Sequence, residues 1–334
     1  MSESPVVAEP SSFRRTAIRR GLLAIALMCV VAFGLVFPFP FEGRLSGEIF
    51  DLAHAPVFCF ALLCLIGFCD PAAIGLPSRY PTILPMKLGR VIAITIALML
   101  AGIVGEYAQK FAGRNASWGD VVANSTGMLA ALAWVASRTQ TGFRRRCLVV
   151  AAVVMIVAIS MNPLRNAWDC IQQIRSFPML SSLERTRELG SWASYGANFE
   201  RSTNWASDGK YSLKAALPPG EYPGVALVWF KHDWRDYSRL KLELMNPSDE
   251  PLLVTLKLFD KYHTMTGFQH NDRFHRDYLL EPGVTVPVDI DLAEVESAPA
   301  SRKMILKWMW SIEIFSSNVK QTRFLHVDHL RLTK

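Results

Sequence analysis

The sequence predicts a multi-domain protein, in which a five-helix transmembrane bundle is followed by an extracytoplasmic all-β sandwich. Three observations support this fold class. The first half of the chain contains five long stretches with almost no charge, Lys and Arg gather in alternate loops between them, and the second half alternates apolar with polar residues. A chain of 334 residues is long enough for about two domains.

Five stretches are long and apolar enough for helices that cross a bilayer, which requires roughly 20 residues each. Most of each stretch is free of charge, and the second contains, from Leu52 to Cys69, only His54 as an ionisable group other than cysteine. We therefore expect transmembrane helices at residues 21–41, 52–70, 91–110, 118–137 and 147–163. The first lacks a small-residue cleavage site and precedes further spans, so we expect an uncleaved helix rather than a signal peptide.

The basic residues of the short loops predict the orientation of the bundle, because Lys and Arg are enriched on the cytoplasmic side. Eleven of them lie in the basic tail 1–20 and in the loops after the second and fourth helices, against three in the other short loops. We expect a multi-pass protein of the bacterial inner (cytoplasmic) membrane, with a cytoplasmic N-terminus and a periplasmic or extracellular C-terminal domain. The net charge of +7 is largely this topology signal, so membrane lipid is an expected partner and nucleic acid is not.

Seven polar side chains lie close together at the predicted outer ends of helices two, three and four. They are Asp51, His54, Glu106, Gln109, Arg114, Asp120 and Asn124. Residues spaced i,i+3 or i,i+4 share one helix face, and ionisable groups at such depth usually face the bundle interior or a wet cavity. We therefore expect a polar pocket that opens outward. Ser117 is expected to cap the fourth helix, and Gly127 to allow another helix to approach closely.

The segments "DLAHAPVF" and "EYAQKFAGRNASWGDVVANSTG" resemble the VanZ-like membrane family, which is named for a teicoplanin-resistance (glycopeptide-resistance) protein. The family patterns D-x-x-H and E-x-x-Q…R…D-x-x-x-N-x-x-G match the seven polar residues and Gly127 position by position. The resemblance covers about residues 45–137. It implies a membrane bundle with a polar site, but no reaction, because the molecular activity of the family is poorly defined.

The chemistry of the predicted polar pocket is open to several interpretations. With Asp51 orienting its ring, His54 can act as a general base, and Arg114 can bind a phosphate or carboxylate in bidentate fashion. Alternatively, Arg114 pairs with Glu106 and Asp120, and the set serves only to hold the helices together. A metal ion at His54, Asp51, Glu106 and Asp120 is only weakly indicated, because one His with scattered carboxylates is not a specific metal pattern.

Residues 164–190 have helical periodicity and mixed charge, and are expected to form a juxtamembrane helical connector. Residues 191–334 have period two, as in "RLKLELMN" and "VTVPVDIDL", with turn sequences such as "PPG" and "NPSDEP" between the runs. This pattern predicts about eight short strands in an antiparallel sandwich. Pro287 predicts an edge strand, because proline cannot donate a hydrogen bond to a sheet ladder.

The same region resembles the galactose-binding-like jelly rolls found among carbohydrate-binding modules, over about residues 199–333. The resemblance rests on "FERSTNWASDGKYSLKAAL", "DWRDYSRLKLELMNP" and the closing "HVDHLRL". It implies a jelly-roll sandwich in which a structural calcium ion bridges the opening and closing strands. The matching carboxylates are Glu200, Asp208 and Asp328, whose oxygens are the hard ligands that calcium prefers. Ordinary turn carboxylates are the alternative interpretation of these three residues.

A sugar ligand would stack its apolar faces on aromatic rings while planar polar groups bind its hydroxyls. The aromatic candidates are Trp229, Trp234, Tyr237, Tyr262, Phe274 and Trp310. About half of them are expected in the core, because strand residues alternate between two faces. The segment "DKYHTMTGFQHNDRFHRDY" is predicted to be a ligand-facing loop, since it is rich in polar and aromatic residues without simple alternation. The predicted glycan-binding residues are Asp260, Tyr262, His263, Asp272, Arg273 and Phe274.

Two functions of different classes follow from these features. In the first, the sandwich binds an envelope polysaccharide or lipid-linked sugar, and the bundle anchors it in the membrane beside a pocket for an envelope headgroup. In the second, a membrane-embedded enzyme uses Asp51, His54, Glu106, Arg114 and Asp120 for acid/base chemistry on that headgroup. A purely structural envelope protein is the third alternative. Calcium is the one cofactor that the sequence suggests.

Overall fold

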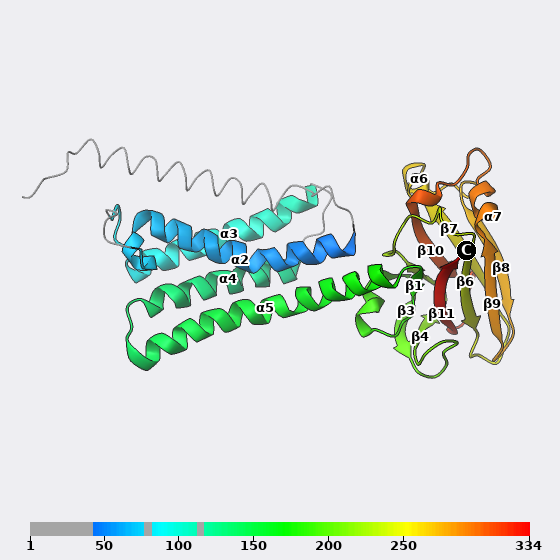
Figure 1. Ribbon diagram of the computed structural model, residues 1–334, viewed down its shortest axis with the longest axis horizontal. Coiled ribbons are helices and arrows are strands. Elements are labelled where there is room, and N and C mark those ends of the chain that lie inside the picture. Colours follow the sequence, from blue (N-terminus) through cyan, green and yellow to red (C-terminus); the bar gives the residue numbers. More distant parts are fainter. Residues whose placement is uncertain (1–42, 77–81, 112–116) are drawn as a thin grey trace, which may run out of the picture. The chain divides into compact units, whose positions relative to one another are not determined.

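A computed structural model of the chain describes residues 43–76, 82–111 and 117–334. The chain divides into two compact units, Met1–Arg165 and Asn166–Lys334. Within the described residues, a helical N-terminal region is followed by a two-sheet antiparallel β-sandwich (Figure 1), in agreement with the predicted succession of the two classes. The predicted basic tail 1–20 and first helix 21–41 lie outside the described residues, and they stay predictions.

The described part of the helical unit contains α2 (Arg44–Cys69), η1 (Pro71–Ile74), α3 (Leu88–Phe111), α4 (Trp118–Ser137) and most of α5 (Gly142–Ser176). Apolar side chains from the facing sides of the long helices form its core, among them Phe58, Leu98 and Met128. The helix α4 begins after Ser117, whose Oγ accepts a hydrogen bond from the Gly119 amide at 3.0 Å. Such a bond satisfies one of the backbone donors at a helix start.

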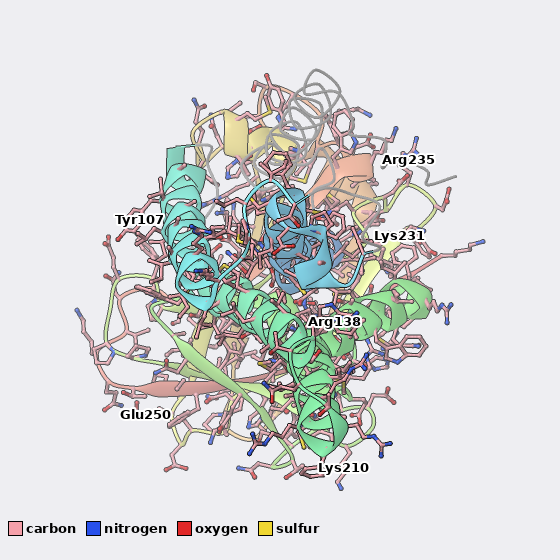
Figure 2. All side chains as sticks on the ribbon, turned by 90° about the vertical axis from the view of Figure 1, so that its left-hand side faces the viewer. Tyr107, Arg138, Lys210, Lys231, Arg235 and Glu250 are labelled. Atoms are coloured by element: carbon pink, nitrogen blue, oxygen red, sulfur yellow. The ribbon has the colours of Figure 1, made fainter. Side chains whose placement is uncertain are left out.

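Three helices in the described part of the chain are long and apolar enough to cross a membrane, and they span Arg44–Cys69, Leu88–Ala108 and Gly142–Ser176. Large apolar side chains of α3 are exposed, including Leu100 (59%) and Tyr107 (61%, labelled in Figure 2). Such a surface is typical of a membrane or partner contact. The polar residues of α4 explain why this helix is not among the three. The candidate spans indicate a membrane protein, and its orientation stays a prediction.

The helix α5 (Gly142–Ser176) is longer than the predicted span 147–163. It continues through Pro163 and takes in the first part of the predicted connector. Its last turns are held by buried contacts within the second unit, where the Gln173 amide donates hydrogen bonds to the carbonyl oxygens of Leu180 (3.2 Å) and Trp229 (3.0 Å). Hydrophobicity alone did not predict these contacts, because they are polar and join residues distant in sequence.

The β-sandwich contains eleven strands, all of them within the described residues 179–333. The first sheet, which we call the β11 sheet, has the order β3-β4-β11-β6-β9, with β1 also paired to β11, and the second, the β10 sheet, has the order β2-β5-β10-β7-β8. The strands of the β11 sheet are β1 (Met179–Ser181), β3 (Asn198–Ser202), β4 (Ser212–Leu217), β6 (Arg239–Met245), β9 (Thr285–Asp291) and β11 (Arg323–Thr333). Those of the β10 sheet are β2 (Trp192–Tyr195), β5 (Gly224–Leu227), β7 (Leu252–Asp260), β8 (Phe274–Leu280) and β10 (Met309–Phe315). The short helices are η2 (Thr186–Ser191), α6 (Lys261–Met265), α7 (Leu292–Ser297) and η3 (Leu306–Trp308).

The period-two pattern correctly predicted which side chains of β6 face the core of the sandwich. Leu240, Leu242 and Leu244 of β6 are buried and belong to one continuous apolar cluster contributed by both sheets. The strand β9 with its Pro287 lies at the edge of the β11 sheet, where a missing backbone donor does not interrupt a ladder. The first strand of the sandwich, β1, lies within residues 164–190, for which a helical connector was predicted. It belongs to the sandwich because it pairs with β11.

Candidate functional site

Three helices bring four of the predicted polar residues into one buried group, which we call the His54 cluster. It consists of His54 on α2, Glu106 on α3, and Asp120 and Asn124 on α4, each less than 9% exposed. One ligand atom from each of His54, Glu106 and Asp120 lies within 4.8 Å of the others. The Nδ1 atom of His54 is 2.9 Å from Asn124 Oδ1, and its Nε2 atom is 3.9 Å from Asp120 Oδ2.

A close approach of α2 and α4 positions the His54 cluster. Gly127 lies one turn after Asn124, and a Cβ atom built on it would be 2.1 Å from the carbonyl oxygen of Ala55. No side chain fits in that space, so the glycine lets the two helix backbones touch, as small residues do in membrane bundles. Because Ala55 is the neighbour of His54, this contact brings the imidazole within hydrogen-bonding distance of Asn124.

The other three residues of the predicted pocket are placed differently. Asp51 is exposed on the surface of α2, one turn before His54. Arg114 and the side chain of Gln109 lie outside the described part of the chain. The His54 ring is hydrogen-bonded through Nδ1 to Asn124 Oδ1 on another helix, and the predicted role of Asp51 in orienting the ring stays a prediction. The catalytic or binding roles of all seven residues stay predictions.

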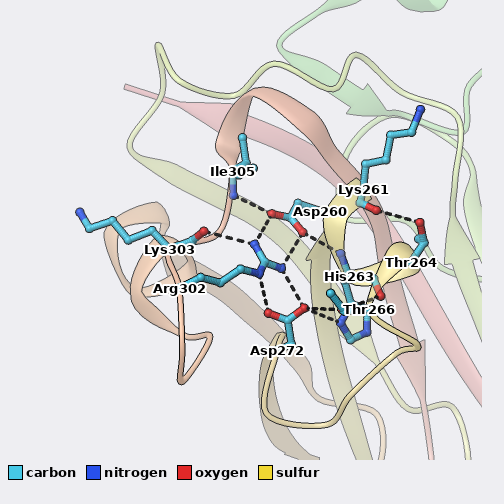
Figure 3. Close-up of polar contacts among 9 residues, drawn as sticks. All are labelled: Asp260, Lys261, His263, Thr264, Thr266, Asp272, Arg302, Lys303 and Ile305. Carbon is cyan, nitrogen blue, oxygen red and sulfur yellow. Dashed lines mark hydrogen bonds and ion pairs between the residues drawn. The ribbon is translucent and has the colours of Figure 1, made fainter.

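Most of the predicted ligand-facing segment is regular structure rather than an open loop, since it contains the end of β7, α6 and β8. Asp260 (0% exposed) and Asp272 (5%) are buried and share the Arg302 guanidinium (Figure 3). Arg302 donates to Asp260 at 2.6 and 2.8 Å and to Asp272 at 2.6 and 3.0 Å. Asp260 also accepts hydrogen bonds from the amides of His263 (3.1 Å) and Ile305 (2.7 Å). We call this group the Arg302 network.

The Arg302 network ties α6 and the segment around residue 302 to the end of β7. Burial alone would raise the pKa of Asp272, but hydrogen bonds from Arg302 and Thr266 and the charge of Arg302 lower it overall. The Asp272 carboxylate is therefore ionised, and the guanidinium holds both carboxylates. Of the other predicted glycan-binding residues, His263 and Phe274 are buried, Arg273 is partly buried and Tyr262 is 45% exposed. Trp234 is fully buried in the core.

The three predicted calcium ligands do not form one compact carboxylate group. Asp328 is fully buried and accepts hydrogen bonds from the amides of Ser207 (2.8 Å), Asp208 (3.1 Å) and His329 (2.7 Å). Burial raises the pKa of Asp328 despite these hydrogen bonds. The side chains of Asp208 and Glu200 are 60% and 70% exposed. Asp328 therefore holds the turn after β3 through backbone amides, and calcium binding stays a prediction.

His326 on β11 makes the stability of the sandwich depend on pH. Its Nδ1 atom is 2.8 Å from Ser212 Oγ, whose proton goes to the Trp205 carbonyl oxygen (2.5 Å), so His326 donates. Burial and the charge of Lys214 lower the pKa of His326 from 6.5 to about 4. The unfolded chain thus binds a proton below pH 6.5 that the folded chain binds only below about 4.

Stability is therefore expected to fall as the pH is lowered from 6.5 towards 4, by at most about 1.4 kcal/mol per pH unit from this group. In the variant His326→Asn, whose amide replaces the Nδ1 donor, this part of the loss should disappear. Chemical unfolding at pH 7 and pH 5 measures it, with His270→Asn at an exposed position as the matched control. Equal losses in the wild type and His326→Asn would contradict the assignment.

The outer face of the β10 sheet carries a row of polar and aromatic side chains that the sequence interpretation missed. Glu313 lies between the buried Ile312 and Ile314, so it points away from the core. Lys257 lies opposite Glu313 on β7, and its Nζ atom is 3.0 Å from Glu313 Oε2. Burial, with the charge and hydrogen bond of Glu313, raises the pKa of Tyr195 to about 12. The tyrosine hydroxyl therefore stays protonated beside Glu313.

Two further aromatic residues adjoin this row. Phe315 follows on the same face of β10, and Tyr222 packs edge-on against it with ring centroids 6.0 Å apart. Gly224 separates Tyr195 from Phe315 in the sheet register, and a Cβ on it would lie 2.4 Å from Phe315 Cβ. We call Tyr195, Tyr222, Lys257, Glu313 and Phe315 the Tyr195 face. Alternation in "WSIEIFSS" places Glu313 and Phe315 on one side of a strand, but no local signal adds Tyr195.

Arg273, one of the predicted glycan-binding residues, lies near the Tyr195 face. Burial lowers its pKa, while the charges of Glu313 and Tyr222 act in the opposite direction. Of the predicted glycan-binding residues, Arg273 therefore lies beside the Tyr195 face. Four others are buried, namely Asp260, His263, Asp272 and Phe274. Strand pairing between residues about thirty to ninety positions apart determines which side chains meet here.

Comparison with known proteins gives matches to solved structures alone. No protein-family model and no curated protein matches the chain. An exo-β-agarase is 15% identical with a TM-score of 0.37, over 46% of this chain and 24% of that one. The family 11 carbohydrate-binding module from Clostridium thermocellum, in complex with a β-1,3-1,4-mixed-linked tetrasaccharide, is 13% identical with a TM-score of 0.36, over 46% of this chain and 94% of the module. The agarase AgWH50C is 13% identical with a TM-score of 0.35, over 47% of this chain and 26% of that one.

The matches concern the sandwich, which is similar to carbohydrate-binding modules. The chain spans about a quarter of the length of the two agarases. The described part of the chain is a helical region with membrane-length apolar helices followed by a two-sheet antiparallel sandwich. No family model supports the resemblance to the VanZ-like family, which stays a prediction from the eight motif positions.

Proposed function

We propose that this chain is a membrane-anchored glycan-binding protein, in which the Tyr195 face of the sandwich binds a polysaccharide of the cell envelope or its surroundings. One observation carries the proposal. The outer face of the β10 sheet presents exposed aromatic rings, Tyr195 (48%) and Tyr222 (56%), beside the fixed ion pair of Lys257 and Glu313. Rings provide flat apolar contact area with a polar edge, and the charged pair provides donors and acceptors for hydroxyl groups.

The geometry of the ion pair favours binding of a neutral ligand with many hydroxyl groups. Lys257 and Glu313 neutralise each other across 3.0 Å, and their side chains are 9% and 12% exposed. Because the two charges are already paired, Lys257 and Glu313 together add no net charge to the face, and Arg273 beside it is the nearby group with a positive charge. Each group keeps further hydrogen-bonding capacity, since an ammonium has three donors and a carboxylate has about four acceptor positions.

In the same proposal, the helical region is a VanZ-like bundle of five membrane crossings with a cytoplasmic N-terminus. The sandwich then lies outside the cytoplasmic membrane, where polysaccharide is present. The buried His54 cluster supports the second candidate function, a membrane-embedded site that acts on or binds an envelope or lipid-linked headgroup. Its support is the gathering of His54, Glu106 and Asp120 from three helices within 4.8 Å, since such groups in a membrane mark functional sites by default.

Glycan binding is tested by titration calorimetry on the full chain in lipid nanodiscs, with a panel of oligosaccharides that includes mixed-linked β-1,3-1,4-glucans and agaro-oligosaccharides, with and without calcium. We expect saturable binding of one class of neutral oligosaccharide. Tyr195→Ala and Glu313→Gln should each weaken that binding about tenfold or more, which corresponds to about 1.4 kcal/mol.

The matched control is Phe324→Ala, which removes a 37% exposed aromatic ring from β11 in the other sheet. Its affinity should equal that of the wild type. If Phe324→Ala weakens binding as much as Tyr195→Ala does, the ligand does not lie on the Tyr195 face. If no oligosaccharide binds to the folded chain, the proposed function is wrong.

A further inference from the structure

The His54 cluster has the composition and spacing of a metal site. Its three ligand atoms are one imidazole nitrogen and two carboxylate oxygens, all within 4.8 Å of one another. Ligands of a tetrahedral divalent ion lie about 3.3–3.6 Å apart when each bond is 2.0–2.2 Å long. Side-chain rotations that shorten the separations by roughly an ångström would therefore let all three atoms contact one ion. The sequence had given only scattered residues, whereas the fold brings them together from α2, α3 and α4.

The hydrogen bond between His54 Nδ1 and Asn124 leaves the other ring nitrogen, Nε2, available to bind a metal ion. Asn124 Oδ1, 2.9 Å away, can only accept a hydrogen bond, so His54 Nδ1 carries the proton. The neutral ring then has its lone pair on Nε2, on the side of Asp120. The Nε2–Asp120 distance of 3.9 Å is too long for a hydrogen bond. Metal-binding histidines are typically held in this way, with the other ring nitrogen donating to an oxygen of a neighbouring residue.

Two of the three ligand groups are buried carboxylates. Glu106 is 4% exposed and Asp120 is 8% exposed, in a unit whose helices α2 and α3 are long and apolar enough for a membrane. Buried carboxylates in proteins are usually paired or bound to a metal. A divalent ion would contact both groups at once, and would also draw His54 Nε2 and Asp120 Oδ2 towards a common centre.

We propose that His54, Glu106 and Asp120 bind a divalent transition-metal ion of the zinc class, with Asn124 as the positioning residue for the imidazole. One nitrogen and two oxygens suit zinc or manganese better than calcium, which prefers six to eight oxygen ligands. Three protein ligands leave at least one coordination position for water or for a phosphate or carboxylate oxygen. The inference is independent of glycan binding, since it concerns the helical unit alone.

The test measures metal in the full chain, purified in detergent with an affinity tag that contains no histidine. After equilibration with zinc chloride and removal of free metal, elemental analysis should find about one zinc ion per chain. Glu106→Gln and Asp120→Asn should lower zinc affinity on the order of 100-fold. Glu48→Gln makes the same carboxylate-to-amide change on α2 outside the cluster and should leave zinc binding unchanged. Cobalt should give a visible absorption band in the wild type and in Glu48→Gln that both cluster variants lack.

Asn124→Ala separates positioning from ligation. This variant keeps all three ligands, so it should still bind about one zinc ion at saturation, with an affinity roughly 10–100-fold lower. Gel filtration and circular dichroism show that each variant is folded. The proposal is overturned if the folded wild type retains no zinc or manganese, or if Glu106→Gln and Asp120→Asn retain as much as Glu48→Gln does.

Discussion

Replacing Arg302 with methionine is expected to lower the free energy of unfolding of the sandwich by about 3–5 kcal/mol, because it leaves two buried carboxylates without their cation. The side chains of Asp260 and Asp272 are 0% and 7% exposed, and that of Arg302 is 17% exposed. Arg302 makes four hydrogen bonds to them, at 2.6–3.0 Å. Guanidinium unfolding of the detergent-solubilised full chain, followed by tryptophan fluorescence, measures the change.

Arg235→Met is the matched control for this experiment. Arg235 (Figure 2) also forms a short ion pair, with its Nη2 atom 2.7 Å from Asp233 Oδ2, but the two side chains are 58% and 38% exposed. Water solvates both partners when an exposed pair is broken, so little loss of stability is expected. If Arg302→Met destabilises the sandwich no more than Arg235→Met does, the Arg302 network does not hold this end of the β10 sheet.

Replacing Gly127 with alanine is expected to separate α2 from α4 and to break the His54–Asn124 hydrogen bond. The added Cβ would lie 2.1 Å from the Ala55 carbonyl oxygen and 3.0 Å from its Cα. These are backbone atoms, so a side-chain rotation cannot relieve the overlap. We expect a loss of about 2–4 kcal/mol or more, comparable with severe overpacking in a core. Thermal unfolding in detergent and the zinc affinity of the His54 cluster should both decline.

Gly105→Ala provides the comparison at a helical glycine with open space. A Cβ at Gly105 of α3 meets nothing within 4 Å, and alanine in a helix interior is more favourable than glycine by up to about 1 kcal/mol. This variant should be at least as stable as the wild type. Equal stability of Gly127→Ala and Gly105→Ala would show that α2 and α4 do not touch at this point.

Features encoded by local sequence were predictable. The bounds of α4 follow from a capping serine and a run of helix-forming residues, and the Ser117 cap is present. Pro287 predicted an edge strand and β9 is one, because a missing backbone donor is a local property. The alternation of Leu240, Leu242 and Leu244 predicted the inner face of β6, because strand side chains alternate regardless of their partners.

The site residues were harder to predict, because their environment depends on distant partners. Asp260, His263 and Asp272 look like surface groups in the sequence, yet Arg302, about thirty to forty residues away, draws both carboxylates into a buried network. The Tyr195 face combines β2, β5, β7 and β10, whose order in the sheet is not their order in the chain. Likewise, α5 extends beyond its apolar stretch because Gln173 bonds to Leu180 and Trp229.

The most direct test of the glycan-binding face is amide hydrogen exchange, measured by mass spectrometry on the full chain in nanodiscs with and without the oligosaccharide selected by calorimetry. Binding at the Tyr195 face should slow exchange in β2, β5, β7 and β10, where these side chains and their neighbours lie. Exchange in β3, β4 and β6 of the β11 sheet should not change. Protection confined to the β11 sheet, or no protection at a saturating oligosaccharide concentration, would contradict the account.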